Sequence, residues 1–280
     1  MNSRYNYSFA RLRRKLGLMK FPSAGLFILL LLLSSSAIQA QSLNEVLNAV
    51  SNNVRRFEDM IPDFVCNERV TSSQYESGRL VKQRVVESLF TGVQRSTEEN
   101  NFRFAFTESR EVVAIDGKPV RKGKEFPKLP YRFTGGYSSL LVTTFAPENL
   151  DVHDYTLGDR YKSGNSNALM VKFATKEGQQ KLRSMLQGKP MLSHDTGAAW
   201  IDLETFQVLR LQRRSLNLPS DLSRSLATID YGPVTIDETT FWIPLKVDAE
   251  VTEKNSPASV SYVAEYTDCK KFTTNIKIVQ

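Results

Sequence analysis

The sequence has few of the residues that build metal centres. Only two of its 280 residues are cysteine and two are histidine, too few for a Cys- or His-rich zinc module. It contains no H-E-x-x-H, P-loop or dinucleotide-binding motif and no G-x-S-x-G nucleophile elbow. His153 or His194 could serve as a base, but a packing or surface role is expected for each. The sequence therefore predicts no metal, no cofactor and no recognisable enzyme activity, although its 30 acids leave a glycosidase-type carboxylate pair open.

Acidic residues are absent from the first 40 positions, which hold six of the 37 basic residues. Subtracting those six leaves 31 basic against 30 acidic residues, so the remainder of the chain is almost neutral although the whole carries +7. The basic excess therefore does not indicate a nucleic-acid-binding protein. Hydrophobic residues make up 41% of the chain, which excludes a disordered protein.

No apolar run is long enough to span a bilayer, which takes roughly 20 residues. The run Ala24–Leu33 has ten uncharged residues, follows basic residues and precedes small ones, which is typical of a secretory signal peptide. Cleavage is expected after Ala40, with Ala37 as the alternative, and Met19 offers a second start. An uncleaved anchor stays open. We expect a protein exported to the periplasm or the exterior, without a stable membrane span after cleavage, that folds as one domain over residues 41–280.

Cys66 and Cys269 are the only cysteines and lie near opposite ends of the expected mature chain. Exported compartments permit disulfides. A bridge between the two would close a loop of about 200 residues, worth roughly 4–5 kcal/mol in the chain-entropy model. We predict this disulfide, with two separate buried thiols as the alternative.

The mature chain begins with an amphipathic helix. Ser42 and Glu45 have the spacing of a capping box, apolar residues then recur at helical spacing as far as Ile61, and Pro62 ends the pattern. A membrane-surface helix would show the same apolar stripe, but the polar face here is mixed in charge. Packing against a sheet is the better interpretation.

From residue 64 onward the apolar residues alternate, which predicts strands joined by hairpins. Asp116-Gly117 is a hairpin-type turn. The expected strands are Phe64–Tyr75, Arg79–Val93, Asn101–Ser109, Glu111–Ile115, Asn149–Tyr161, Ala168–Thr175, Ala198–Asp202, Phe206–Leu216, Arg224–Tyr231, Phe241–Thr252 and Ser259–Lys270.

Two interruptions have helical spacing, Tyr137–Phe145 and Glu177–Gln187, and both are too short to be stable unless they pack against the sheet. The predicted fold is therefore mainly β within the α+β class. It is an antiparallel curved sheet, or half-open barrel, of about eleven strands with an N-terminal helix and two short mid-chain helices.

This layout resembles the half-open barrel class of the lipoprotein carriers LolA and LolB and of the envelope stress regulator RseB. The Trp200–Arg210 hairpin (WIDLETFQVLR) carries that resemblance. Ile61–Cys66 (IPDFVC), the helix after Gly135-Gly136 that ends in Phe145-Ala146-Pro147, and the same hairpin also resemble a group of exported, uncharacterised acidobacterial proteins. These motifs concern layout, not catalysis.

In the carrier class a curved sheet covered by short helices encloses an apolar cavity for acyl chains. The resemblance therefore implies an envelope protein that binds a lipid, a lipoprotein or another hydrophobic ligand without catalysis. The alternative is that the aromatic residues simply fill a core. The candidate lining residues are Phe102, Phe104, Phe106, Leu140, Leu141, Phe145, Trp200 and Trp242.

A basic, proline-punctuated stretch around residues 118–132 is the second candidate contact. Arg121, Lys122, Lys124 and Lys128 are opposed there only by Glu125. Clustered cations of this kind could meet anionic head groups, lipopolysaccharide or nucleic acid. A solvated loop without a partner is the competing interpretation, and no nucleic-acid partner is predicted.

The RseB-like members of the class imply a different function. They use this fold as a sensing module that binds protein partners. The alternative to a lipid carrier is therefore a protein-interaction or sensory module of the cell envelope with a packed core and no cargo.

Overall fold

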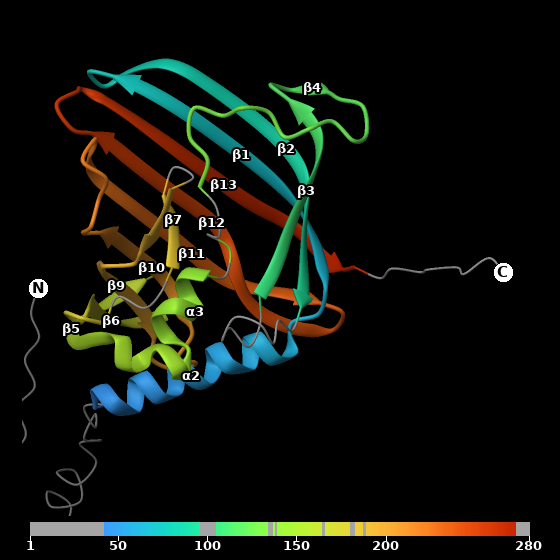
Figure 1. The fold of residues 1–280 in the computed structure, drawn as a ribbon. Coiled ribbons are helices and arrows are strands. Elements are labelled where there is room, and N and C mark those ends of the chain that lie inside the picture. Colours follow the sequence, from blue (N-terminus) through green and yellow to red (C-terminus); the bar gives the residue numbers. More distant parts are fainter. Residues whose placement is uncertain are drawn as a thin grey trace, which may run out of the picture. The chain divides into compact units, whose positions relative to one another are not determined.

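The computed structural model describes residues 42–95, 105–133, 137, 139–163, 166–179, 183–186 and 189–272. Eleven strands form one antiparallel sheet that curves without closing, in the order β4-β3-β2-β1-β13-β12-β11-β10-β9-β6-β5 (Figure 1). The strands are β1 (Phe64–Glu76), β2 (Arg79–Arg95), β3 (Ala105–Ile115), β4 (Lys118–Pro119), β5 (His153–Ser163), β6 (Ser166–Thr175), β9 (Asp195–Asp202), β10 (Val208–Ser215), β11 (Leu222–Ile236), β12 (Thr239–Glu253) and β13 (Ala258–Lys271). The predicted fold class is confirmed.

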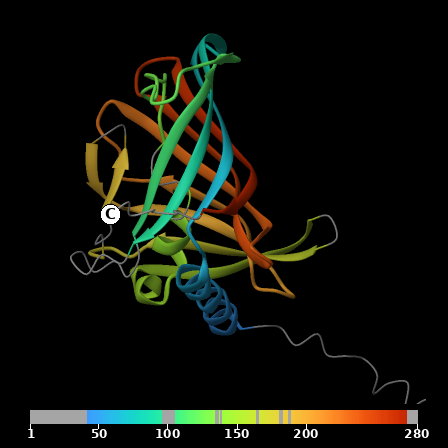
Figure 2. The same cartoon turned by 90° about the vertical axis from the view of Figure 1, so that its right-hand side faces the viewer.

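The helix α2 (Leu43–Met60) begins as the sequence predicts. The Ser42 hydroxyl accepts a hydrogen bond from the Glu45 amide, and the Glu45 carboxylate accepts one from the Ser42 amide at 2.8 Å. The helix ends at Met60 because Pro62 cannot continue the pattern, and the amide of the C-cap residue Ile61 still donates to the Phe57 carbonyl. Its buried stripe packs into the core. Figure 2 shows α2 below the sheet, beside the green helix α3 (Ser139–Phe145).

The predicted helix over Glu177–Gln187 is wrong. This region holds β7 (Arg183–Leu186), which pairs with β8 (Lys189–Leu192) in a separate two-stranded sheet. A turn at Lys176–Gln179, in which Gly178 has a φ of +77°, occupies what would have been the first helical turn. The short apolar run that follows fits either periodicity, and pairing with β8 satisfies its backbone.

The other mid-chain helix is confirmed as α3 (Ser139–Phe145) and is followed by a 3-10 helix, η1 (Pro147–Val152), that was not predicted. Two strands expected on either side of Arg110 are one strand, β3. The turn after β3 is the predicted hairpin turn, in which Asp116 and Gly117 both have positive φ, at 50° and 74°.

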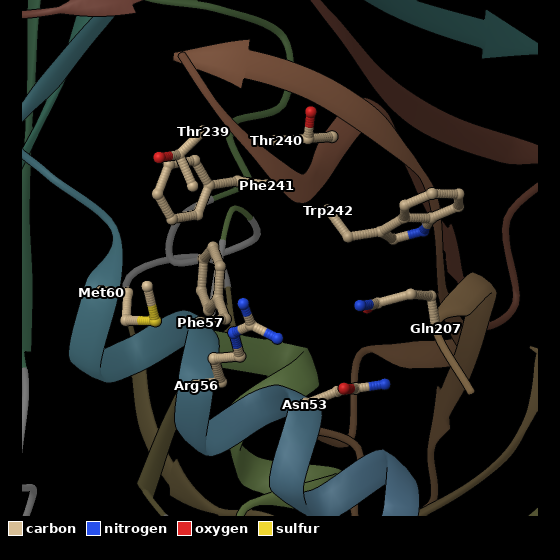
Figure 3. Close-up of a pocket in the computed structure, with 9 residues that line it drawn as sticks. All are labelled: Asn53, Arg56, Phe57, Met60, Gln207, Thr239, Thr240, Phe241 and Trp242. Carbon is tan, nitrogen blue, oxygen red and sulfur yellow. The ribbon is translucent and has the colours of Figure 1, made fainter. Parts of the chain in front are cut away.

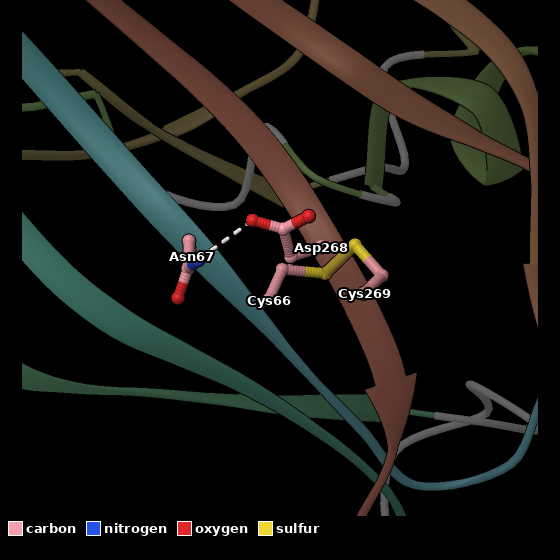
Figure 4. Close-up of a disulfide and its surroundings, with 4 residues drawn as sticks. All are labelled: Cys66, Asn67, Asp268 and Cys269. Carbon is pink, nitrogen blue, oxygen red and sulfur yellow. Dashed lines mark hydrogen bonds between the residues drawn. A yellow bond between two sulfur atoms is a disulfide. The ribbon is translucent and has the colours of Figure 1, made fainter.

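The predicted disulfide joins Cys66 on β1 to Cys269 on β13, across a sequence separation of 203 residues (Figure 4). The two strands are neighbours in the sheet, with a register irregularity between Val65 and Asn67. The Asn67 amide nitrogen donates to the Asp268 carboxylate at 3.0 Å beside the bridge. Within the described residues, no helix combines the length and apolar character that crossing a bilayer requires.

Candidate functional site

The α3 residues proposed to line a ligand cavity lie in the hydrophobic core. Leu140, Leu141 and Phe145 are 1%, 6% and 0% exposed. The Phe145 ring lies 5.9 Å from the Tyr155 ring and 6.5 Å from the Phe173 ring, measured between centroids. These side chains therefore tie α3 to β5 and β6, and they contribute to the core whether or not a ligand binds.

The two tryptophans lie in different places. Trp200 is on the opposite face of β9 from Ala199 and Ile201, which are both fully buried in the core. The prediction that Trp200 lines the concave face is therefore wrong. Trp242 is half-buried, and its indole N–H donates to the Val208 carbonyl at 2.8 Å. Phe102, Phe104 and the side chain of Phe106 lie outside the described residues.

The aromatic lining that the structure shows on the concave face comes from other residues. The Phe90 ring lies 4.8 Å from that of Tyr137 and 5.2 Å from that of Tyr266, and the Phe64 ring lies 6.1 Å from Phe90. Alternation along β1, β2 and β13 is the signal that could have identified Phe64, Phe90 and Tyr266. The Tyr137 hydroxyl is buried without a hydrogen-bond partner among the described residues.

A buried ionic cluster crosses the same face. The Glu68 side chain is fully buried, accepts a 2.7 Å hydrogen bond from the Ser88 hydroxyl and receives the Arg110 Nε at 2.9 Å. The Arg110 guanidinium also lies 3.3 Å from Glu108 and 4.9 Å from the centre of the Phe90 ring. Burial raises the pKa of Glu108 in spite of Arg110. The cluster holds β1, β2 and β3 in register and places charge inside an otherwise apolar surface.

The basic stretch is a covering segment and not simply a solvated loop. We call residues 120–133 the strap. Its apolar side chains pack against the core, and those of Arg121, Lys122, Lys124 and Lys128 are exposed to solvent. Figure 1 shows this green segment running from β4 across β1 and β13. The packed side chains are Val120, Phe126, Leu129, Tyr131 and Phe133.

The two ends of the strap are fastened to different strands of the sheet. At its far end the Tyr131 amide donates to the Ser72 hydroxyl at 2.9 Å, and that hydroxyl donates to the Tyr131 carbonyl at 2.8 Å. At its near end the Val120 amide donates to the Val113 carbonyl of β3 at 3.0 Å. Ser72 and Arg84 are register partners in β1 and β2. The strap thus leaves the sheet at β3 and returns to it at β1, across β2.

A small pocket of about 130 Å³ lies between the end of α2 and the start of β12 (Figure 3). Phe57, Phe241 and Trp242 form its apolar walls, and Arg56 is an exposed cation at its edge. Binding sites for drug-sized ligands are typically about 300–1,000 Å³. This pocket is therefore too small for a whole lipid. Asn53, Met60, Gln207, Thr239 and Thr240 complete its lining.

The histidine that is nearest to a catalytic arrangement is packed among rings. His153 is 5% exposed, its ring centre lies 5.6 Å from that of Phe173 and 5.9 Å from that of Tyr155, and its Nδ1 has no partner among the described residues. Burial lowers the pKa of His153. His194 is half-buried and its carbonyl accepts the Leu216 amide. Across the described residues no three His, Cys, Asp or Glu side chains are grouped to hold a metal.

The sequence matches no family model and no curated protein. Among solved structures, a DUF1329 family protein from Desulfovibrio piger is 11% identical with a TM-score of 0.37 and covers 83% of this chain and 95% of its own. A LolA superfamily protein from Nitrosomonas europaea is 12% identical with a TM-score of 0.37, covering 84% and 97%. A domain described as an outer membrane lipoprotein-sorting protein, from Vibrio parahaemolyticus, is 10% identical with a TM-score of 0.38, covering 83% and 94%. Similarities at this level assign neither a family nor a function to the chain.

Proposed function

We propose that this chain is an exported, non-catalytic binding protein that holds an apolar ligand, a lipid or the lipid part of a lipoprotein, against the concave face of its sheet. The observation that carries the proposal is the strap. One end of the concave face is covered by helices that belong to the core, whereas the other is covered by an irregular segment. A rigid cover at one end and an irregular covering segment at the other are expected of a site that closes over a bound ligand.

We propose that the strap can lift although its apolar side chains pack against the core, because each polar contact that fastens it is weak. Its far end depends on the two hydrogen bonds between Ser72 and Tyr131, and each such bond contributes about 0.5–1.5 kcal/mol net. Between the described residues of the strap and β13, the ring pair that the structure shows is Phe133 with Tyr262, with centroids 6.5 Å apart. Lifting the strap leaves the ladders of β1, β2 and β13 intact.

The surface beneath the strap suits an apolar group with a polar end. Tyr262 and Val70 are buried at or near the level of Ser72 on this face, and Tyr266 and Phe90 lie farther along it. The Glu68–Arg110 pair follows at the level of Tyr266 and Ser88. An acyl chain placed here would bury apolar surface at about 25 cal/mol per Å².

The test is lipid extraction from protein purified after export, followed by mass spectrometry, together with binding of an apolar fluorescent dye. Ser72→Ala loosens the strap, and Ser225→Ala is the matched control because it removes a buried hydroxyl from β11. We expect copurified lipid in the native protein and higher dye binding in Ser72→Ala than in Ser225→Ala. Absence of lipid, with equal dye binding in all three proteins, would refute the proposal.

A protein-interaction or sensory module of the envelope is the second candidate, and a specific observation favours it. The α3 residues expected to line a cavity are fully packed, and the pocket beside α2 has room for only about 130 Å³. Under this alternative the exported protein carries no lipid, binds no apolar dye, and instead copurifies with one envelope protein at a fixed ratio.

A further inference from the structure

The outer side of the strap is an exposed cationic surface. Arg121, Lys122, Lys124 and Lys128 point to solvent. Among these four, the ion pair that the structure shows joins Lys122 to Glu111 at 3.7 Å, and the Lys122 side chain remains 86% exposed. Glu125 is the only acid within the strap sequence. This surface therefore presents several unneutralised positive charges within a short stretch of chain.

The hairpin between β1 and β2 provides a second, independent feature. Leu80 and Val81 are consecutive aliphatic residues that are 46% and 47% exposed, and the exposed cations Arg79 and Lys82 flank them. The register between the two strands shifts here, because Gln74 pairs with Lys82 and Tyr75 with Leu80. Two adjacent aliphatic side chains are thus left at the tip, uncovered by the core.

The two features lie at the same end of the sheet. Lys82 is two residues from Arg84, the register partner of Ser72, to which the far end of the strap is bonded, and two residues correspond to about 7 Å along the strand. Both ribbon views place the β1–β2 hairpin and β4, from which the strap starts, at the upper end of the domain, away from α2 (Figures 1 and 2).

Cations beside exposed aliphatic side chains match the chemistry of a bilayer surface. Lys and Arg bind anionic head groups, and aliphatic side chains bury themselves at the boundary of the acyl chains. Single-stranded nucleic acid would instead require free aromatic faces for stacking. Here Tyr131 is buried, and the Phe126 ring is covered by the Arg132 guanidinium at 4.9 Å.

We propose that the strap and the β1–β2 hairpin together form a docking surface for an anionic lipid bilayer. Docking through this surface places the strap between the membrane and the concave face. A ligand that leaves the bilayer would then meet the concave face as the strap lifts, a consequence that rests on the function proposed above. The docking itself does not require that function.

The test is flotation of the exported protein with vesicles of phosphatidylcholine alone, and of phosphatidylcholine with an equal part of phosphatidylglycerol. We expect flotation only with the anionic vesicles, weakened between about 0.15 M and 0.5 M salt because exposed charges are screened. Each cation at an anionic surface strengthens binding about fivefold. The double variant Lys124→Glu/Lys128→Glu should therefore bind at least about 25-fold more weakly.

The matched control is Lys162→Glu/Lys172→Glu, which reverses two exposed lysines on β5 and β6, at the opposite edge of the sheet. Leu80→Ser/Val81→Ser tests the aliphatic tip and should lower the part of the binding that persists at high salt. Circular dichroism and the melting temperature verify that each variant is folded.

The docking proposal is overturned if Lys124→Glu/Lys128→Glu floats as the native protein does, or if the β5–β6 control loses as much binding. It is also overturned if the protein binds an oligonucleotide but no anionic vesicle. Flotation of a protein that has no copurified lipid, and whose dye binding does not change in Ser72→Ala, would refute the proposed carriage and leave the docking surface standing. Copurified lipid without flotation would do the reverse.

Discussion

The two ends of the concave face are covered in different ways. At the end near Phe64, α2 and α3 insert regular, fully buried apolar faces, and a disulfide joins the neighbouring strands β1 and β13. At the end near Ser72, the cover is the strap, whose inner side is apolar and whose outer side is basic. The helical cover is part of the folding core. The strap is a cover that the sheet does not need for its own hydrogen bonding.

The disulfide at the helical end should give the largest effect. Cys66→Ala/Cys269→Ala releases a loop of 203 residues, which in the chain-entropy model costs about 5 kcal/mol of stability. We expect a melting temperature at least about 10 °C lower by calorimetry. Reductant should lower the melting temperature of the native protein to that of the variant and leave the variant unchanged. A native protein insensitive to reductant would contradict this.

A pair of aromatic truncations compares the two covers directly. Phe145→Ala removes a fully buried ring from α3, and such truncations cost about 3–5 kcal/mol. Tyr131→Ala removes a buried ring from the strap, and it should lower the global free energy of unfolding clearly less because the strap detaches before the sheet unfolds. Urea denaturation measures both values. Equal losses would show that the strap is as much a part of the core as α3.

Local release of the strap should be visible at Ser72. Ser72→Ala removes both hydrogen bonds to Tyr131, a loss of about 1–3 kcal/mol that falls mainly on the strap. Trypsin should then cut more rapidly after the exposed Arg121, Lys122, Lys124 and Lys128. Ser225→Ala should leave the cleavage rate unchanged. Cleavage equally slow in both variants would argue against a strap held by Ser72.

The smallest expected effect is a pH dependence at the helical end. Burial lowers the pKa of His153, so the unfolded chain takes up a proton more readily than the folded chain as pH falls. The stability that the neutral, buried His153 contributes is fully present above pH 6.5, the pKa of histidine in the unfolded chain, and is lost as the pH falls below it. The loss at pH 5.5 is at most about 1.4 kcal/mol. In His153→Phe, the midpoint of urea denaturation should change less between pH 7.5 and pH 5.5 than it does in the native protein. An unchanged slope would count against the buried position.

The sequence predicts the elements whose signals are local. The capping box at Ser42 and Glu45 defines the start of α2, the alternation defines nearly every strand, and the expectation of export makes the pairing of Cys66 with Cys269 reasonable. The helix expected over residues 177–187 failed because the turn at Gly178 breaks the pattern where the helix would start. Its few apolar residues could not decide the periodicity.

The features of the site depend on contacts between distant residues. Tyr131 and Ser72 are 59 positions apart in the chain. The basic residues of the strap could therefore be identified from the sequence, but the packing of its apolar side chains against the core could not. Alternation separates the faces of β9 but does not say which face is concave, and Trp200 was therefore assigned to the wrong one. The pairing of Glu68 with Ser88 and Arg110 could not be predicted from the sequence, because these residues lie 20 and 42 positions away in the chain.

Hydrogen exchange of the exported protein, followed by mass spectrometry, tests the difference between the two covers most directly. We predict that peptides from the strap, including the Tyr131 amide, exchange through local opening at a free energy well below that of global unfolding. Peptides from α3 should exchange only near the global value. Strap and α3 peptides that exchange together, at the global value alone, would contradict the account of a removable cover over the concave face.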